Sequence, residues 1–111
     1  MGRGSSTHYR QVVTAQLVIQ PEAEADLQDA FTWYERRQAG LGHKMLDEAR
    51  RAFTRIGLDP TSPRPRFRKT RRVRLKRFPY VVLYVIRQDV VYVLGVLHER
   101  RSPRIYRSRT S

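Results

Sequence analysis

A run of basic side chains between residues 64 and 77 is the part of the sequence best suited to chemistry. Nine of its fourteen residues are Lys or Arg. Guanidinium groups bind phosphate and carboxylate oxygens through paired hydrogen bonds, so this density favours a polyanion or an acidic protein as partner. More arginines follow near the C-terminus. The basic residues expected to contact a target or an inhibitor are Arg68, Lys69, Arg71, Arg72, Arg74, Lys76, Arg77, Arg100, Arg101 and Arg104.

Groups able to move protons are fewer. Histidine titrates near neutral pH, so His98, which closes an apolar run, is a candidate general base; a structural role at the end of a strand is the simpler alternative. Arginines stay charged at any working pH and are poor proton shuttles. The chain has no cysteine, its three histidines are scattered, and no Gly-rich phosphate loop occurs. The sequence therefore predicts neither a metal site nor a cofactor.

The charge of the chain is large and unevenly distributed. Lys and Arg number 23 against 10 Asp and Glu, a net charge of +13. Residues 1–63 hold eight basic and eight acidic side chains, whereas residues 64–111 hold fifteen and two. A face that served only solubility would mix both signs, so a binding surface is favoured. Charge alone does not distinguish a nucleic acid from an acidic protein as the partner.

The first half of the sequence predicts a strand and two helices that would support this surface. Residues 12–19 are rich in residues that favour strands, and Pro21 ends this predicted strand. From Pro21, acidic residues in the first turn and apolar residues at helical spacing predict a helix to residue 38. Gly40 and Gly42 predict a tight turn, and a second one-sided apolar stripe predicts a helix from about residue 43 to residue 56.

The second half predicts a sheet. Residues 59–65 contain three prolines and no periodicity, and alternation from residue 72 to residue 76 places Val73 and Leu75 toward the core. The apolar runs 78–86 and 90–98, joined by a short polar turn, predict a hairpin of buried strands. The predicted fold is α+β, in the order β-α-α-β-β-β, with a helical hairpin packed on one face of a mainly antiparallel four-stranded sheet.

The length of 111 residues predicts one domain. We expect residues 1–10 to be a disordered N-terminal extension, residues 11–104 the domain, and residues 105–111 a basic tail. No long apolar run or signal-like segment occurs, so a cytoplasmic protein without a membrane contact is expected. Trp33 lies off the apolar stripe of the first helix and is expected to anchor a partner.

Two segments carry a family resemblance. RRVRLKRFPYVVLYVI (71–86) and VVYVLGVLHERRSP (90–103) resemble the C-terminal sheet of the ParE/RelE toxin superfamily, the plasmid stabilisation proteins of type II toxin-antitoxin systems. Residues 21–56 are similar to its helical hairpin, so the resemblance covers residues 17–103. It implies a toxin that forms a hetero-oligomer with a partly disordered acidic antitoxin, which wraps it through a helix or an added strand.

The superfamily has two activities. RelE-like members cut messenger RNA on the ribosome, whereas ParE-like members inhibit DNA gyrase without known catalytic residues. The resemblance places Val81 where RelE-like enzymes carry an arginine, which favours a ParE-like gyrase inhibitor that is not an enzyme. The alternatives are an endoribonuclease and a non-toxic basic nucleic-acid-binding module. The residues that a nuclease would use are Arg72, Arg74, His98, Arg100, Arg101 and Tyr106.

Overall fold

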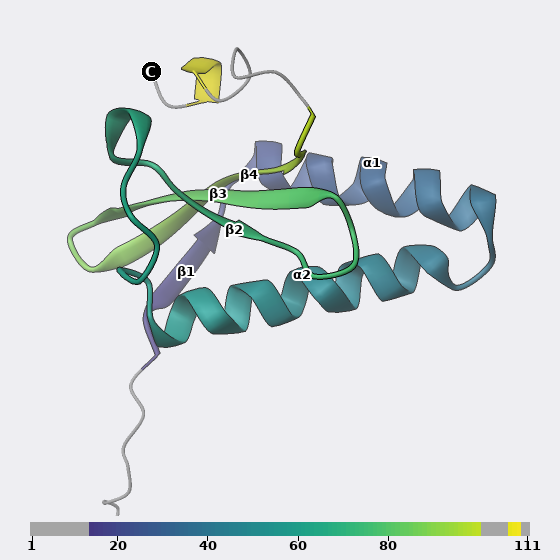
Figure 1. Cartoon of the computed structure of the whole chain (residues 1–111), viewed down its shortest axis with the longest axis horizontal. Coiled ribbons are helices and arrows are strands. Elements are labelled where there is room, and N and C mark those ends of the chain that lie inside the picture. The colour runs from purple at the N-terminus through teal and green to yellow at the C-terminus, as the bar shows by residue number, and fades with distance from the viewer. Residues whose placement is uncertain (1–13, 101–106, 110–111) are drawn as a thin grey trace, which may run out of the picture.

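A computed structural model describes residues 14–100 and 107–109, which form a helical hairpin on one face of a four-stranded sheet (Figure 1). The predicted α+β class and element order are confirmed. In chain order the elements are β1 (Gln16–Ile19), α1 (Pro21–Arg37), α2 (Leu41–Leu58), the short 3-10 turn η1 (Phe67–Lys69), β2 (Arg71–Arg74), β3 (Tyr80–Arg87) and β4 (Val90–His98). The predicted extension at residues 1–10 lies outside the described residues.

The sheet is mixed, with strand order β1-β4-β3-β2. Strand β1 runs parallel to β4, and the other two pairings are antiparallel. The parallel pairing ends where Ile19 lies opposite Val93. Within the part of the chain that the structure describes, β4 therefore has no neighbouring strand beyond Val93 on the β1 side.

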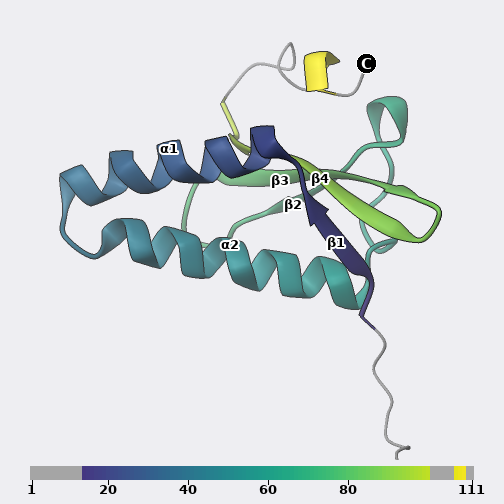
Figure 2. The ribbon, with the colours of Figure 1, turned by 180° about the vertical axis from the view of Figure 1, so that it is seen from behind.

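The helical hairpin begins as the sequence predicts, with Pro21 at the first position of α1 and acidic residues in its first turn. Gly40 supplies the turn, because its φ of 89° lies in the left-handed region. The role predicted for Gly42 was wrong: α2 starts at Leu41, so Gly42 is helical. A Cβ at Gly42 would lie 2.6 Å from the carbonyl oxygen of Phe31. Glycine is needed there so that the two helices can approach closely (Figure 2).

Glu35 fixes the connection between the helices. Its carboxylate accepts the backbone N–H of Gly40 at 2.8 Å and that of Gly42 at 2.9 Å. The hydrogen bond from Gly40 is the main cause that lowers the pKa of Glu35. The first turn of α2 has no capping side chain at Gly40 itself, so Glu35 satisfies free N–H groups of that turn.

The main core lies between the helices and the inner face of the sheet. Met45 and Ile56 of α2 pack there with Val82, Tyr84 and other buried residues of the strands. Tyr84 is fully buried, and its hydroxyl donates to the Pro60 carbonyl at 2.7 Å. This bond joins the strand to the proline-rich connection and satisfies the polar end of a core side chain.

The predicted hairpin of β3 and β4 is confirmed. Gln88 and Asp89 both have positive φ, as in the two-residue turns whose twist suits antiparallel strands. Farther along, Leu83 pairs with Gly95 but Tyr84 pairs with Val93, so Leu94 is an extra residue in β4. This β-bulge leaves Leu94 outside the regular hydrogen-bond ladder.

Candidate partner-binding surface

Strand β2 lies at one edge of the sheet and carries three arginines of the basic run, two of which share one face. Arg72 and Arg74 are exposed, and their cross-strand partners are Leu83 and Val81. Cross-strand partners point to the same side of a sheet, and the next residue along β3, Val82, belongs to the core beneath the helices. Arg72 and Arg74 therefore lie on the face away from the helices, here called the outer face.

The outer face also carries a row of apolar side chains. Val81, Leu83, Val85 and Leu97 are between 1% and 5% exposed. Val81 and Leu97 are direct cross-strand partners, so the row crosses from β3 to β4. Val81 is thus a buried packing residue and not a place from which a cation could reach a phosphate.

Arg74 is already paired within the chain. Its Nε lies 2.8 Å from Oε1 of Glu99, and its carbonyl oxygen accepts a bond from Arg55 at 3.3 Å. The hydrogen bond between Arg74 and Glu99 is the main cause that raises the pKa of Arg74 and lowers that of Glu99. Both side chains are substantially exposed, so the pair contributes little to stability. An incoming carboxylate or phosphate would have to compete with Glu99.

Arg71 does not share this face, although the sequence grouped it with its neighbours. Its cross-strand partner is the core residue Tyr84, and its guanidinium donates to the Pro63 carbonyl at 3.4 Å. Arg71 therefore holds the proline-rich connection. The basic strip on the outer face therefore consists of Arg72 and Arg74 in this strand. It is narrower than predicted, because alternate residues of a strand point to opposite faces.

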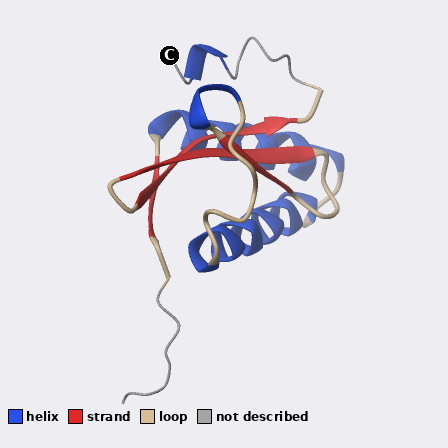
Figure 3. Cartoon of the chain, turned by 60° about the vertical axis from the view of Figure 1, so that its left-hand side comes forward, coloured by secondary structure: helices blue, strands red, loops and turns tan. Residues whose placement is uncertain are grey.

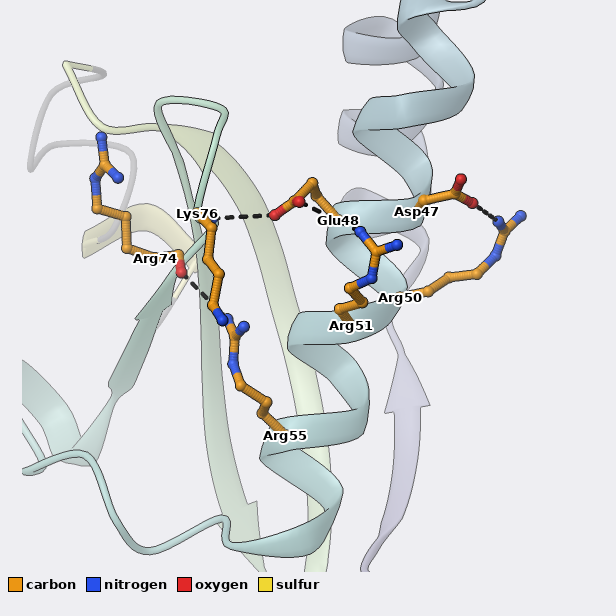
Figure 4. A network of polar contacts seen from close by, with 7 residues as sticks. All are labelled: Asp47, Glu48, Arg50, Arg51, Arg55, Arg74 and Lys76. Carbon is orange, nitrogen blue, oxygen red and sulfur yellow. Dashed lines mark hydrogen bonds and ion pairs between the residues drawn. The ribbon is translucent and has the colours of Figure 1, made fainter.

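The strand also ends earlier than the alternation predicts, because Glu48 binds the chain after it. Glu48 is 6% exposed, and its carboxylate accepts the backbone N–H of Lys76 at 3.2 Å and a guanidinium N–H of Arg51 at 3.3 Å (Figure 4). The segment that carries Lys76 and Arg77 is thereby fixed to α2 instead of continuing β2. Both basic side chains remain exposed.

A second basic group surrounds Phe67 in η1. Phe67 is 49% exposed, and the guanidinium carbons of Arg68 and Arg107 lie 5.1 Å and 5.7 Å from its ring centre. Arg68 and Lys69 have left-handed backbone, with φ of 54° and 63°. This conformation is uncommon for such residues. Thr70 supports it by donating its hydroxyl to the Phe67 carbonyl at 2.6 Å.

His98 is engaged at one nitrogen. Its Nδ1 accepts the backbone N–H of Arg100 at 3.1 Å, and its ring meets that of Tyr80 edge to face at 5.3 Å. With Nδ1 as the acceptor, the neutral imidazole carries its proton on Nε2. Neither nitrogen then presents a free lone pair, so this arrangement suits a structural histidine better than a general base.

Trp33 lies in a different place from the basic strip. It is 50% exposed, with the Arg37 guanidinium 4.0 Å from its ring centre. It lines a groove of about 370 Å³ between α1 and the end of the sheet, together with Asp29, Tyr34 and His98. The indole therefore belongs to the helical side of the molecule and not to β2, and its role as a partner anchor stays a prediction.

The predicted contact residues therefore form separate groups. Arg72 and Arg74 share the outer face, Arg68 and Lys69 gather at η1, and Arg100 follows β4. Arg101, Arg104 and Tyr106 lie outside the described residues, so a nuclease site that includes them stays a prediction.

Two acidic partners were missed by sequence reasoning. Glu99 and Glu48 both bind groups of the basic segment. Glu99 could have been found, since it is one of only two acidic residues after residue 63. Glu48 has no such signal, because the sequence does not distinguish a buried glutamate that accepts hydrogen bonds from a solvent-exposed glutamate on a helix.

Among residues 14–100 and 107–109, no helix is long and apolar enough to cross a membrane. The same residues contain no group of three or more His, Asp or Glu placed to hold a metal ion.

One comparison with known proteins identifies a family, and another shows the fold. A family model described as "ParE toxin of type II toxin-antitoxin system, parDE" matches residues 17–103. Among solved structures, a chain of the chromosomal ParDE toxin-antitoxin system from P. aeruginosa is similar, with a TM-score of 0.69 and 16% identity. The match covers 77% of this chain and 96% of that one, and at this identity it shows the fold alone. No curated protein sequence matches.

Proposed function

The chain belongs to the ParE toxin family of type II toxin-antitoxin systems, and on this premise we propose that it inhibits DNA gyrase by binding it. A cognate acidic antitoxin would cover the toxin until it is released. The proposal follows the ParE-like branch of the family and assigns no catalytic step to the protein.

The surroundings of Val81 carry the proposal. Val81 is 4% exposed, at the position where the family resemblance leads us to expect an arginine in the RNA-cleaving branch. Beside it, Arg74 is paired with Glu99. His98 uses Nδ1 to accept a backbone N–H. Cleavage of RNA by its 2′-hydroxyl needs a base, an acid and a cation at the phosphate, and this arrangement favours binding over such chemistry.

The charge distribution supports an acidic partner protein. All of the net positive charge of +13 lies after residue 63, and like charges at this density favour an anionic surface that neutralises them. An acidic antitoxin meets this requirement. Charge complementarity of this kind also speeds association at low salt.

The test of the gyrase proposal uses the two outer-face arginines. We expect the purified protein to inhibit supercoiling by gyrase, and the double variant Arg72→Ala/Arg74→Ala to need at least about tenfold more protein for the same inhibition. Arg50→Ala is the matched control, because Arg50 is an exposed arginine on α2 whose side chain pairs with Asp47. Equal loss in the control and the double variant would refute the assignment of the outer face.

A further inference from the structure

Arg109 ties the C-terminal segment back to the body of the protein. Its Nη1 lies 2.7 Å from Oδ2 of Asp26 in α1, and its Nη2 lies 3.2 Å from Oδ1. Nη1 also donates to the Leu94 carbonyl at 3.1 Å. The hydrogen bond to Asp26 is the main cause that raises the pKa of Arg109. Residues 83 positions apart in sequence are thereby joined by a two-pronged ion pair.

The receptor for this guanidinium is held in place by the sheet. Leu94 is the extra residue of the β-bulge, and its carbonyl oxygen accepts the hydrogen bond from Arg109. Strand β1 has already ended at Ile19, which leaves this side of β4 open to α1. Asp26 of α1 lies on this open side of β4. Its Oδ2 accepts the Val96 N–H at 2.9 Å, which fixes the carboxylate beside the bulge.

Gly95 leaves the space that the guanidinium fills. A Cβ at Gly95 would lie 2.7 Å from Nη1 of Arg109 and 3.2 Å from Oδ2 of Asp26. The side chains of Arg109 and Asp26 are 21% and 15% exposed, so both are largely shielded from water. A fixed carboxylate beside a carbonyl oxygen suits a planar cation with several N–H donors better than a compact ammonium group.

We propose that Asp26, the Leu94 carbonyl and the gap at Gly95 form a guanidinium-binding site that Arg109 of the same chain fills. Arg109 is then a positioning residue for the turn at residues 107–109. That turn lies on the side of the sheet opposite α2, near η1 (Figure 3). A partner that presents an arginine side chain would compete with Arg109. The inference rests on this geometry and not on gyrase as the target.

The first test empties the site and refills it. Arg109→Ala protein is titrated with methylguanidinium while the amide signals of Gly95 and Val96 are followed by NMR. We expect saturable shifts, with affinity at least about tenfold weaker in Asp26→Asn/Arg109→Ala. Ethylammonium should produce no saturable shift. Arg107→Ala removes the same charge but leaves the site filled, so it should behave like the wild-type protein. Equal shifts in wild-type and Arg109→Ala proteins, or none in Arg109→Ala, would overturn the proposal.

A second test leaves Arg109 in place and needs no added ligand. Asn at position 26 keeps an acceptor for the Val96 N–H but removes the charge. We expect Asp26→Asn to accelerate tryptic cleavage after Arg107 at least about tenfold, because the turn is released more often. Asp29→Asn is the control, since Asp29 lies one turn farther along α1, where it lines the groove beside Trp33. An unchanged cleavage rate in Asp26→Asn would contradict the proposed role of Arg109.

Discussion

Glu48 fixes the path of the chain after β2, where Lys76 and Arg77 follow the strand. As a nearly buried carboxylate it receives a backbone N–H from the chain after β2 and a side-chain N–H from its own helix. Glu48 stabilises the fold by accepting hydrogen bonds from these N–H groups, since an N–H donor left unpaired near the core costs free energy.

We predict that Glu48→Ala lowers the free energy of unfolding by about 1–3 kcal/mol, because the N–H of Lys76 loses its acceptor. Asp47→Ala is the matched control: its pair with Arg50 is exposed, and its loss should cost at most about 1 kcal/mol. Urea denaturation of both variants measures the difference. Similar values for the two would show that the Lys76 contact contributes nothing.

The two helical glycines of α2 provide a sharper comparison, because the same change should have opposite effects. At Gly42 a new Cβ meets the backbone of α1, so Gly42→Ala should destabilise the fold by about 1–3 kcal/mol. At Gly57 the nearest atom is 3.6 Å from the new Cβ, an ordinary contact. Gly57→Ala should therefore be neutral or stabilise by up to about 1 kcal/mol. Thermal unfolding would contradict this account if both changes destabilised equally.

At the scale of elements, the connection between α1 and α2 depends on the ionised form of Glu35. Its pKa in the folded protein is lowered, chiefly by the Gly40 N–H. A lowered folded pKa means that the stabilisation is present above the unfolded pKa, about 4.3 for glutamate, and is lost as the pH falls through the folded value.

We predict that the melting temperature of the wild-type protein falls further than that of Glu35→Gln when the pH is lowered from about 5 to about 3. Glutamine keeps one acceptor oxygen but does not titrate, so the variant is less stable at neutral pH and less sensitive to acid. Thermal melts across this range measure the effect. Parallel curves for the two proteins would show that Glu35 is not the group responsible.

Local patterns predicted the elements well, and long-range contacts explain most of what they missed. Periodicity is a property of adjacent residues, so both helices and the β3–β4 hairpin could be placed from sequence. The parallel pairing of β1 joins Gln16 to Val90, and nothing near either residue signals it. The early end of β2 has the same kind of cause, since Glu48 lies 28 positions before Lys76.

For the candidate site, the alternation rule predicted the correct face for Arg72 and Arg74. It could not show that Arg74 forms an ion pair with Glu99, because the two residues are 25 positions apart in the sequence. The grouping of Arg71 with its neighbours was an error of a different kind. Charge density was counted along the chain, whereas the faces of a strand divide neighbouring residues between two surfaces.

At the scale of the whole molecule, the chain divides its charges between two layers. Residues 1–63, which include both helices, carry balanced charges, and residues 64–111, which include β2, β3, β4 and their connections, carry the positive excess. Asp26 links the layers, because it lies on α1 and receives Arg109 from the end of the chain. The segment that carries Arg109 is thus held to α1 by a contact between distant parts of the sequence.

The most direct test of the central claim compares the two activities of the superfamily in one preparation. Purified protein is added to gyrase with relaxed plasmid and, separately, to a bacterial translating extract with a defined message. We predict inhibited supercoiling with the message left intact. Cleavage of ribosome-bound message without any effect on gyrase would contradict it.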